Sequence, residues 1–259
     1  MINKDKKIFI KKSLSTSCLD FRLYFNKKYQ SKNMHSWYQK NIKFRSDAYI
    51  LDVGCGTGAQ TLFFNKKISK EGRLFSFDNS EPSIKKLKNK IGKKKNIKIF
   101  QGNMDEIKNL KKKYFKDIHF DLINTVYSIY YAYNPIKTID VLISYLKKKG
   151  KLNIMVPMKP NKISDIASKF YKLPKKVTDS LIFYQKVINH LKNKKVKHSV
   201  KYFKSKIIVT NLDDIIKFYR STTIYKKKYE KNFEEYLLKN FKGKKFIFNK
   251  NSCLIQMTK

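Results

Sequence analysis

The amino-acid sequence predicts an α/β fold built on a doubly wound, mostly parallel sheet of seven strands. Short apolar runs alternate with stretches of helical pattern along most of the chain. The length of 259 residues, 41% of them hydrophobic, is enough to bury one substantial core. A turn with three glycines, residues 54–58, follows the first apolar run and is typical of a strand that passes into a helix beside a ligand.

The strands are predicted from near-continuous apolar runs, which indicate strands buried on both faces of a parallel sheet. The first run, residues 48–53, ends directly at the glycine turn. Two later apolar runs are predicted to add the strands that complete a mixed sheet. The predicted strands are residues 48–53, 73–77, 97–100, 120–126, 152–156, 200–209 and 246–257.

The helices between these strands are marked by capping residues. Ser80 as N-cap and Pro82 in the first turn begin the helix after the second strand, and Gly92 ends it. Pro135 begins another helix with its apolar residues on one face, and Gly150 ends it. The other predicted helices run to about residue 67 after the glycine turn and over residues 212–221 and 233–241.

Two segments fall outside this alternation. Residues 1–46 are predicted to form a helical N-terminal cap segment, and residues 159–197 an inserted lid or cap within a domain of residues 47–259. The alternation itself needs right-handed crossovers and a parallel sheet covered by helices on both faces.

The net charge of +41 raises the question of a nucleic-acid partner, since cations that neutralise phosphates drive such binding. Only four of the 60 basic residues are arginines, however, and the lysines are spread along the whole chain. Arginine is the preferred residue for bidentate recognition of phosphates and bases. We therefore interpret the charge as compositional and do not favour nucleic acid, although a functional polyanion surface stays an alternative.

Other classes of protein are excluded by composition. The three cysteines are scattered and form no Cys-x-x-Cys pair, which argues against a disulfide scaffold or a thiolate zinc site. No cluster of histidines and carboxylates predicts a metal site. The most apolar stretch, residues 122–133, contains Asn124 and is too polar to span a membrane. We expect a cytoplasmic protein with no membrane span.

The glycine turn carries most of the functional information. Its glycines alone also fit a dinucleotide-binding turn. Asp52 stands two residues before the first glycine, where it suits an ammonium group and would repel a pyrophosphate. Asp78 ends the next strand, 20 residues after Gly58, where a carboxylate can bind both hydroxyls of a ribose. An amine-bearing nucleoside satisfies both conditions, and S-adenosylmethionine is the obvious candidate.

Residues 48–156 resemble the core of the class I S-adenosylmethionine-dependent methyltransferases, which have a Rossmann-like fold. Residues 51–58, Leu-Asp-Val-Gly-Cys-Gly-Thr-Gly, resemble the first motif of that family, and residues 120–123 its fourth-strand motif. The resemblance places Asp78 on the ribose and residues 102–105 on the adenine, with Asn103 where the family often has Asp. The implied cofactor-binding residues are Asp52, Gly54, Cys55, Gly56, Gly58, Asp78, Asn79, Asn103 and Met104.

Residues for the acceptor side are weaker candidates. His35 lies in an aromatic N-terminal segment, and Tyr127 follows the fourth strand, where the substrate of such enzymes approaches the methyl donor; both are catalytic candidates. The candidate substrate-binding residues are Tyr29, Trp37, Tyr130 and Tyr131. A base is needed only where the acceptor is a hydroxyl or a protonated amine.

The predicted function is methylation of a small-molecule acceptor by in-line displacement at S-adenosylmethionine. RNA or protein methylation is the alternative among enzymes, because of the charge. A non-catalytic nucleoside-binding module of the same fold is the alternative from another class, and a nicotinamide oxidoreductase is the weakest contender.

Overall fold

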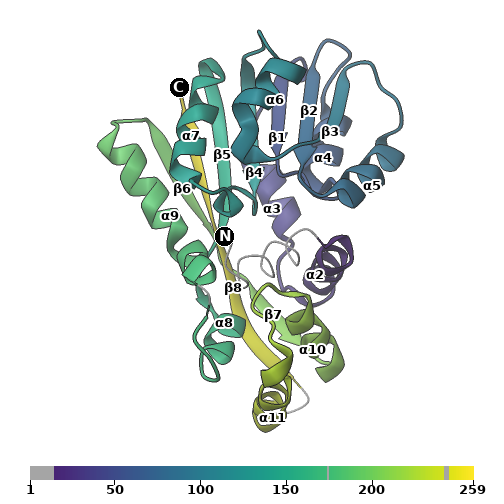
Figure 1. The fold of residues 1–259 in the computed structure, drawn as a ribbon, viewed down its shortest axis with the longest axis vertical. Coiled ribbons are helices and arrows are strands. Elements are labelled where there is room, and N and C mark those ends of the chain that lie inside the picture. The colour runs from purple at the N-terminus through teal and green to yellow at the C-terminus, as the bar shows by residue number, and fades with distance from the viewer. Residues whose placement is uncertain (1–14, 174, 242–244) are drawn as a thin grey trace. The chain divides into compact units, whose positions relative to one another are not determined.

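Eight strands form one sheet in the order β3-β2-β1-β4-β5-β8-β6, and β7 pairs with β8 (Figure 1). The computed structural model describes residues 15–173, 175–241 and 245–259. The strands are β1 (Tyr49–Val53), β2 (Arg73–Asp78), β3 (Ile97–Gln101), β4 (Phe120–Val126), β5 (Leu146–Asn161), β6 (His198–Phe203), β7 (Lys206–Val209) and β8 (Phe246–Thr258). The α-helices are α2 (Thr16–Tyr29), α3 (Met34–Asn41), α4 (Ala59–Lys67), α5 (Glu81–Ile91), α6 (Ile107–Tyr114), α7 (Pro135–Ser144), α8 (Lys162–Ala167), α9 (Lys175–Asn193), α10 (Leu212–Ser221) and α11 (Glu230–Asn240). Three short 3-10 helices are η1 (Met104–Glu106), η2 (Ile129–Tyr131) and η3 (Lys227–Tyr229).

The chain divides into two compact units, each built from separate segments. The larger unit contains His35–Val156, Phe183–Tyr202 and Cys253–Lys259. The smaller unit contains the described residues of Met1–Met34 together with Pro157–Ile182 and Phe203–Ser252. Strands β5 and β8 and helix α9 supply residues to both units.

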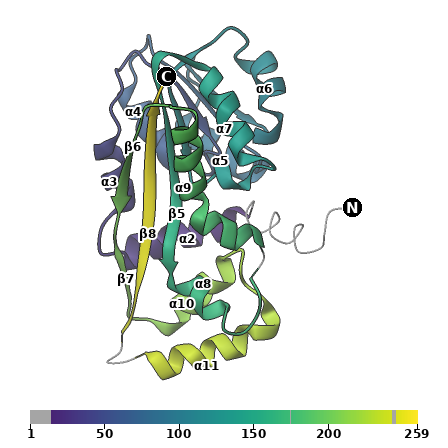
Figure 2. The same cartoon turned by 90° about the vertical axis from the view of Figure 1, so that its left-hand side faces the viewer.

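The larger unit contains the parallel part of the sheet. Strands β3, β2, β1, β4 and β5 pair in parallel, and this order reverses at β1, which lies between β2 and β4. Helices α3 and α4 cover one face of the strands, and α6 and α7 cover the other (Figures 1 and 2). In sheets of this kind, ligands bind outside the carboxyl ends of the strands where the order reverses. That point here is the end of β1.

The predicted α/β class and the mostly parallel doubly wound sheet are confirmed, with one strand more than predicted. The predicted strand 200–209 is two strands, because the chain leaves the ladder at Lys204 and Ser205. Ser205 is held there by β8: its carbonyl accepts from the amide of Lys250 at 2.8 Å, and its amide donates to Asn251 Oδ1 at 3.4 Å.

The predicted helix from Pro135 to Gly150 is wrong at its end. Helix α7 ends at Ser144, and the carbonyl of the next residue, Tyr145, accepts from the amide of Phe120 at 2.9 Å. Leu146 already pairs with Phe120 at the start of β5. Pairing with β4 therefore overrides a helical pattern that continues further in the sequence.

The segment 159–197 is helical over most of its described length, in α8 and α9, after β5 ends at Asn161. Its role as a lid, and that of residues 1–46 as a cap, stay predictions; residues 1–14 of the cap lie outside the described residues. Within the described ranges, no helix is long and apolar enough to cross a membrane.

In the smaller unit, α2 packs against α10. The rings of Phe25 and Phe218 stack with centroids 4.2 Å apart. Lys28 and the hydroxyl of Tyr29 both donate to Asp214 Oδ2, at 2.9 Å and 2.6 Å. Tyr29, a predicted substrate-binding residue, therefore uses its polar group inside this unit.

Candidate functional site

The glycine turn wraps over the carboxyl ends of β1 and β2. The amides of Gly54 and Cys55 both donate to the carbonyl of Phe77, at 2.9 Å and 3.0 Å. The next amide in the turn, that of Gly56, donates to Asp78 Oδ2 at 2.8 Å. The turn is thus fastened to the end of β2 and leads into the N-terminus of α4, where backbone N–H groups favour a bound ligand.

Gly54 has no room for a side chain. Its φ is +69°, and a Cβ there would lie 2.3 Å from Ser128 Cβ, after β4. Ser128 itself is fixed, because its hydroxyl donates to the carbonyl of Val53 at 2.7 Å. The close approach of the ends of β1 and β4 therefore leaves no space for a side chain at residue 54.

Asp78 ends β2 and connects two backbone segments. Its Oδ1 accepts from the amide of Ser80 and its Oδ2 from the amide of Gly56, each at 2.8 Å. Burial raises the pKa of Asp78, and these backbone hydrogen bonds oppose the rise. The amide of Asn79 also bonds to this carboxylate, and a carboxylate has about four acceptor positions, so acceptor capacity remains for a hydroxyl donor.

Asp52 is 2% exposed and lies inside the unit rather than in an open cavity. Its two oxygens accept from Asn124 Nδ2 and from Thr61 Oγ1, each at 2.6 Å. Burial raises the pKa of Asp52 to about 6; the two hydrogen bonds oppose this rise and the charge of Asp78 adds to it.

Neither acid has a basic partner. In a chain with a net charge of +41, neither Asp52 nor Asp78 forms an ion pair with any residue in the described part of the structure. A buried acid and a half-buried one without a counter-charge are costly in an otherwise basic protein. The edge at the end of β1 is therefore electrostatically suited to a ligand with a positive charge.

Four further predicted cofactor residues lie near this edge or on loops that lead from it. The side-chain Sδ-methyl of Met104 lies 3.5 Å from the position of a Cβ on Gly54. Asn103 caps η1 by accepting from the amide of Asp105 at 3.1 Å. Asn79 is exposed, and its carbonyl accepts from Gln101 at 3.3 Å. Cys55 lies within the turn, and burial raises the pKa of its thiol.

His35 approaches the start of α4. Its Nδ1 lies 3.1 Å from Gln60 Nε2, and Gln60 is the second residue of α4. The other side-chain atom of Gln60, Oε1, is buried and has no hydrogen-bond partner among the described residues. Trp37, on the same helix as His35, is half-buried, and its carbonyl accepts from Asn41 at 2.8 Å.

The predicted tyrosines follow β4. Tyr127 has a positive φ of 55°, and its amide donates to the carbonyl of Met155 at 2.8 Å. A left-handed tyrosine is uncommon and marks a strained turn at the strand end. The ring of Tyr130 is buried, with its centroid 4.7 Å from that of Tyr131.

The sequence analysis missed several residues of this edge. Four of them contact a predicted site residue or the end of β1: Thr61, Gln60, Asn124 and Ser128. Tyr38 contacts Asn124. Asn124 carries a signal that could have identified it, because an amide inside an apolar strand must find a buried partner.

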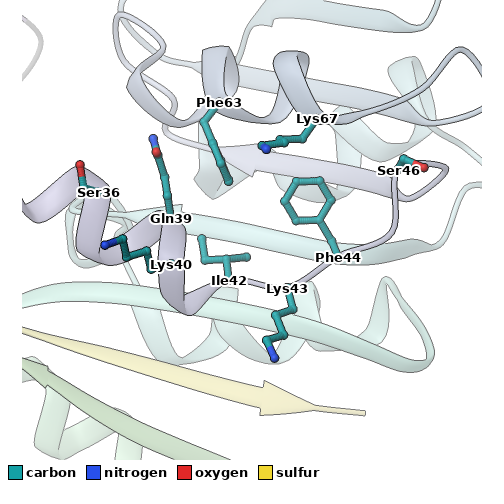
Figure 3. Close-up of a pocket in the computed structure, with 9 residues that line it drawn as sticks. All are labelled: Ser36, Gln39, Lys40, Ile42, Lys43, Phe44, Ser46, Phe63 and Lys67. Atoms are coloured by element: carbon teal, nitrogen blue, oxygen red, sulfur yellow. The ribbon is translucent and has the colours of Figure 1, made fainter.

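A cavity of about 780 Å³ lies away from this edge, between α3, the segment after it and the later part of α4 (Figure 3). None of the predicted site residues lines it. The ammonium groups of Lys40, Lys43 and Lys67 point in different directions and form no common anion site (Figure 3). The described residues contain no group of three or more His, Cys, Asp or Glu placed to hold a metal ion.

Comparisons with known proteins agree with this geometry. A family model described as a methyltransferase domain matches residues 44–236. Two curated relatives are both named ubiquinone/menaquinone biosynthesis C-methyltransferase UbiE. The protein from Wigglesworthia glossinidia brevipalpis is 32% identical over 137 residues, 50% of this chain and 52% of the relative. That from Shewanella pealeana is 30% identical over 134 residues, 49% and 51% of the two chains. The chain thus matches about half the length of these relatives.

Solved structures show the same fold at low sequence identity. A putative methyltransferase from Bacillus halodurans has a TM-score of 0.61 at 15% identity, over 87% of this chain and 98% of the other. The YcgJ protein from Bacillus subtilis has a TM-score of 0.60 at 16% identity, over 87% and 97%.

Proposed function

Because the chain belongs to the methyltransferase domain family, with S-adenosylmethionine as its cofactor, we propose that it transfers a methyl group to a small-molecule acceptor. The observation that carries the proposal is the pair of acids beside the glycine turn, the buried Asp52 and the half-buried Asp78, which have no ion-pair partner among the described residues. S-adenosylmethionine is a nucleoside with a sulfonium and an ammonium group. A dinucleotide, whose pyrophosphate is anionic, would be repelled by Asp52.

The residues at the edge fit this cofactor. Asp78 keeps acceptor capacity for a ribose hydroxyl, and the glycine turn presents its backbone over the ends of β1 and β2. Gln60 Oε1 is a buried acceptor without a partner at the first turn of α4, where an ammonium donor would satisfy it. We assign the cofactor contacts to the predicted set from Asp52 to Met104 given above.

When bound, the cofactor supplies a methyl group already activated by the sulfonium charge. The protein's residues then need to align the acceptor, exclude water and, for some acceptors, remove a proton. We assign alignment to Tyr130, Tyr131 and Trp37, since aromatic side chains give apolar contact with a defined geometry. His35 and Tyr127 are the candidates for holding the acceptor's proton.

The acceptor class is proposed from two considerations. Both curated relatives are named as methyltransferases that act on carbon in quinone biosynthesis, and their match supports a small aromatic acceptor here. The three tyrosines after β4 suit a planar apolar acceptor better than a charged polymer.

The test is a calorimetric titration followed by an acceptor screen. S-adenosylmethionine and its demethylated product should bind with micromolar affinity, and NAD should not. Purified protein with methyl-labelled cofactor should then label small phenols or quinol precursors and leave bulk RNA unlabelled. Absence of binding by both nucleosides would refute the assignment. Cofactor binding without transfer to any acceptor pool would favour a non-catalytic module.

The charge of +41 favours RNA as the second candidate acceptor. Methyl transfer to RNA that falls steeply as salt rises would support it, because phosphate contacts release counterions. Transfer to small acceptors alone, unaffected by competing RNA, would reject it.

A further inference from the structure

A row of polar side chains crosses four neighbouring strands on the face that α3 covers. Asp52 in β1 lies in register with Asn124 in β4, which lies in register with Asn153 in β5. Gln256 in β8 continues the row, because its Nε2 donates to Asn153 Oδ1 at 3.1 Å. Asp52, Asn124 and Asn153 are each at most 2% exposed. Such a row of amide and carboxyl side chains is unexpected in the buried core of a sheet.

The hydrogen bonds of the row have a direction. The hydroxyl of Tyr38, on α3, donates to Asn124 Oδ1. The amide of Asn124 can then present only its N–H groups elsewhere, and Nδ2 donates to Asp52 Oδ1 at 2.6 Å. Thr61 on α4 donates to the other oxygen of Asp52, also at 2.6 Å.

This pattern favours the ionised form of Asp52. A protonated carboxyl needs an acceptor for its own hydrogen, but Asn124 Nδ2 is only a donor, and Thr61 would have to turn its hydrogen away. The ionised form accepts both bonds, and bonds to a charged acceptor are about twice as strong as neutral ones. Donors from β4 and α4 therefore compensate for part of the burial of Asp52.

We propose that Asn124 and Tyr38 are positioning residues which keep Asp52 ionised beneath the glycine turn, so that α3 sets the affinity of the turn for its cationic cofactor. The inference rests on the proposed function, since it takes S-adenosylmethionine as the ligand. Asn124 acts directly on Asp52, and Tyr38 acts through Asn124.

The other titratable groups around Asp52 determine the pH range over which cofactor affinity is expected to change. Asp78 and Cys55 are acids near the turn, and the charge of Asp78 raises the pKa of Asp52. The pKa of Tyr38 is raised well above its ordinary value, by burial first and then by the charge of Asp52, so its phenol keeps its proton. His35 contacts Gln60, the residue before Thr61. With a pKa of about 6, Asp52 changes its charge in an accessible pH range.

The experiment measures the dissociation constant of S-adenosylmethionine by calorimetry between pH 5 and pH 8.5. Wild type should bind more weakly as the pH falls through about 6. Asn124→Leu removes one charge-assisted bond, which raises the pKa of Asp52 by about one unit. Its affinity should therefore be about fivefold below wild type at pH 6 and equal to wild type at pH 8.5. Tyr38→Phe should shift the profile in the same direction by less.

Gln256→Leu is the matched control, because it changes the far end of the same row and leaves the bond from Tyr38 to Asn124 and both donors to Asp52 in place. Its pH profile should match that of wild type. A loss in Asn124→Leu that is equal at every pH would show a merely structural role and overturn the inference, as would a profile identical to wild type.

Titration of the Asp52 side-chain carbon by NMR, without any cofactor, separates this inference from the proposed function. If wild type binds no S-adenosylmethionine at any pH, the proposed function fails. The NMR midpoint would still move upward from wild type to Tyr38→Phe if the two donors act as inferred. An unchanged midpoint overturns the inference whether or not Asn124→Leu folds.

Discussion

Asn124 donates its Nδ2–H to Asp52 Oδ1 over 2.6 Å, and this bond joins β4 to β1 through side chains where the two residues already lie in register. The bond connects the strand that ends at the acceptor-side tyrosines with the strand that ends at the glycine turn. A change in Asp52 is therefore expected to affect both stability and cofactor affinity.

Asp52→Asn should change how stability depends on pH. The pKa of Asp52 in the folded chain, about 6, lies above its ordinary value of 3.8. The folded state then binds this proton more tightly than the unfolded state. Protonated Asp52 therefore contributes to the free energy of unfolding below about pH 4, and this contribution is lost as pH rises through about 6. Relative to wild type, Asp52→Asn should gain about 3 kcal/mol in free energy of unfolding between pH 4 and pH 7.5.

Urea unfolding of both proteins across this pH range measures the gain. The difference between the two proteins is the informative quantity, because acids with lowered pKa, such as Asp214, give the opposite pH slope in both and cancel. If the difference in free energy of unfolding between the two proteins stays constant with pH, Asp52 does not have the raised pKa described above.

Gly54→Ala should abolish cofactor binding, because the new Cβ would lie 2.3 Å from Ser128 Cβ and the turn must move. Gly92→Ala is its control: Gly92 has a similar φ of +71°, but nothing lies within 4 Å of a Cβ there. Both variants should lose about 1–3 kcal/mol in stability from backbone strain, and Gly54→Ala more. Only Gly92→Ala should keep wild-type affinity in a calorimetric titration; equal affinities would mean that the turn tolerates a side chain.

The glycine turn, its acidic residues and the parallel strands could be predicted because local sequence determines them. Left-handed turns need glycine, and buried strands need runs of apolar residues. The ends of α7 and the break between β6 and β7 could not be predicted in this way. Both are decided by pairing with a strand distant in sequence, β4 for α7 and β8 for the break.

The partners of the site residues were equally out of reach. Asn124 is 72 residues from Asp52 and 86 from Tyr38, so no local pattern links them. His190, outside the site, is a second example: its Nε2 lies 2.7 Å from Asp140 Oδ1, and only 18% of its side chain is exposed. That partner lies on α7, 50 residues earlier.

Asp140→Asn should destabilise the larger unit at neutral pH. Burial opposes ionisation of Asp140, but hydrogen bonds from His190 and Lys194 outweigh it and lower the pKa of this acid. Because its pKa is lowered, ionised Asp140 contributes to stability above the ordinary pKa of an aspartate. This contribution is lost as the pH falls through the pKa of Asp140 in the folded chain. The loss should be about 1 kcal/mol or less, because the carboxylate is partly exposed.

Thermal or urea unfolding of Asp140→Asn at pH 7 and at pH 3 checks this contribution. The difference from wild type should shrink at pH 3, below the ordinary pKa of 3.8, because wild type loses this contribution as Asp140 takes up its proton. Lys175→Gln, which breaks the exposed ion pair with Asp179, should show a smaller loss at pH 7. A deficit in Asp140→Asn that is larger at pH 3 than at pH 7 would contradict the lowered pKa.

Asp78→Ala should weaken binding of S-adenosylmethionine by a few kcal/mol at most, because it removes charge-assisted bonds to ribose and the support of the turn through Gly56. Asp121→Ala is the matched control. Asp121 also accepts a backbone amide, that of Tyr49 at 2.8 Å, but it stands at the opposite end of the strands. It should lose stability and keep its affinity. Equal losses of affinity in the two variants would show that Asp78 acts by supporting the fold and has no contact with the ribose. In that case adenosine, which keeps only the ribose and the base, should bind the two variants with equal affinity.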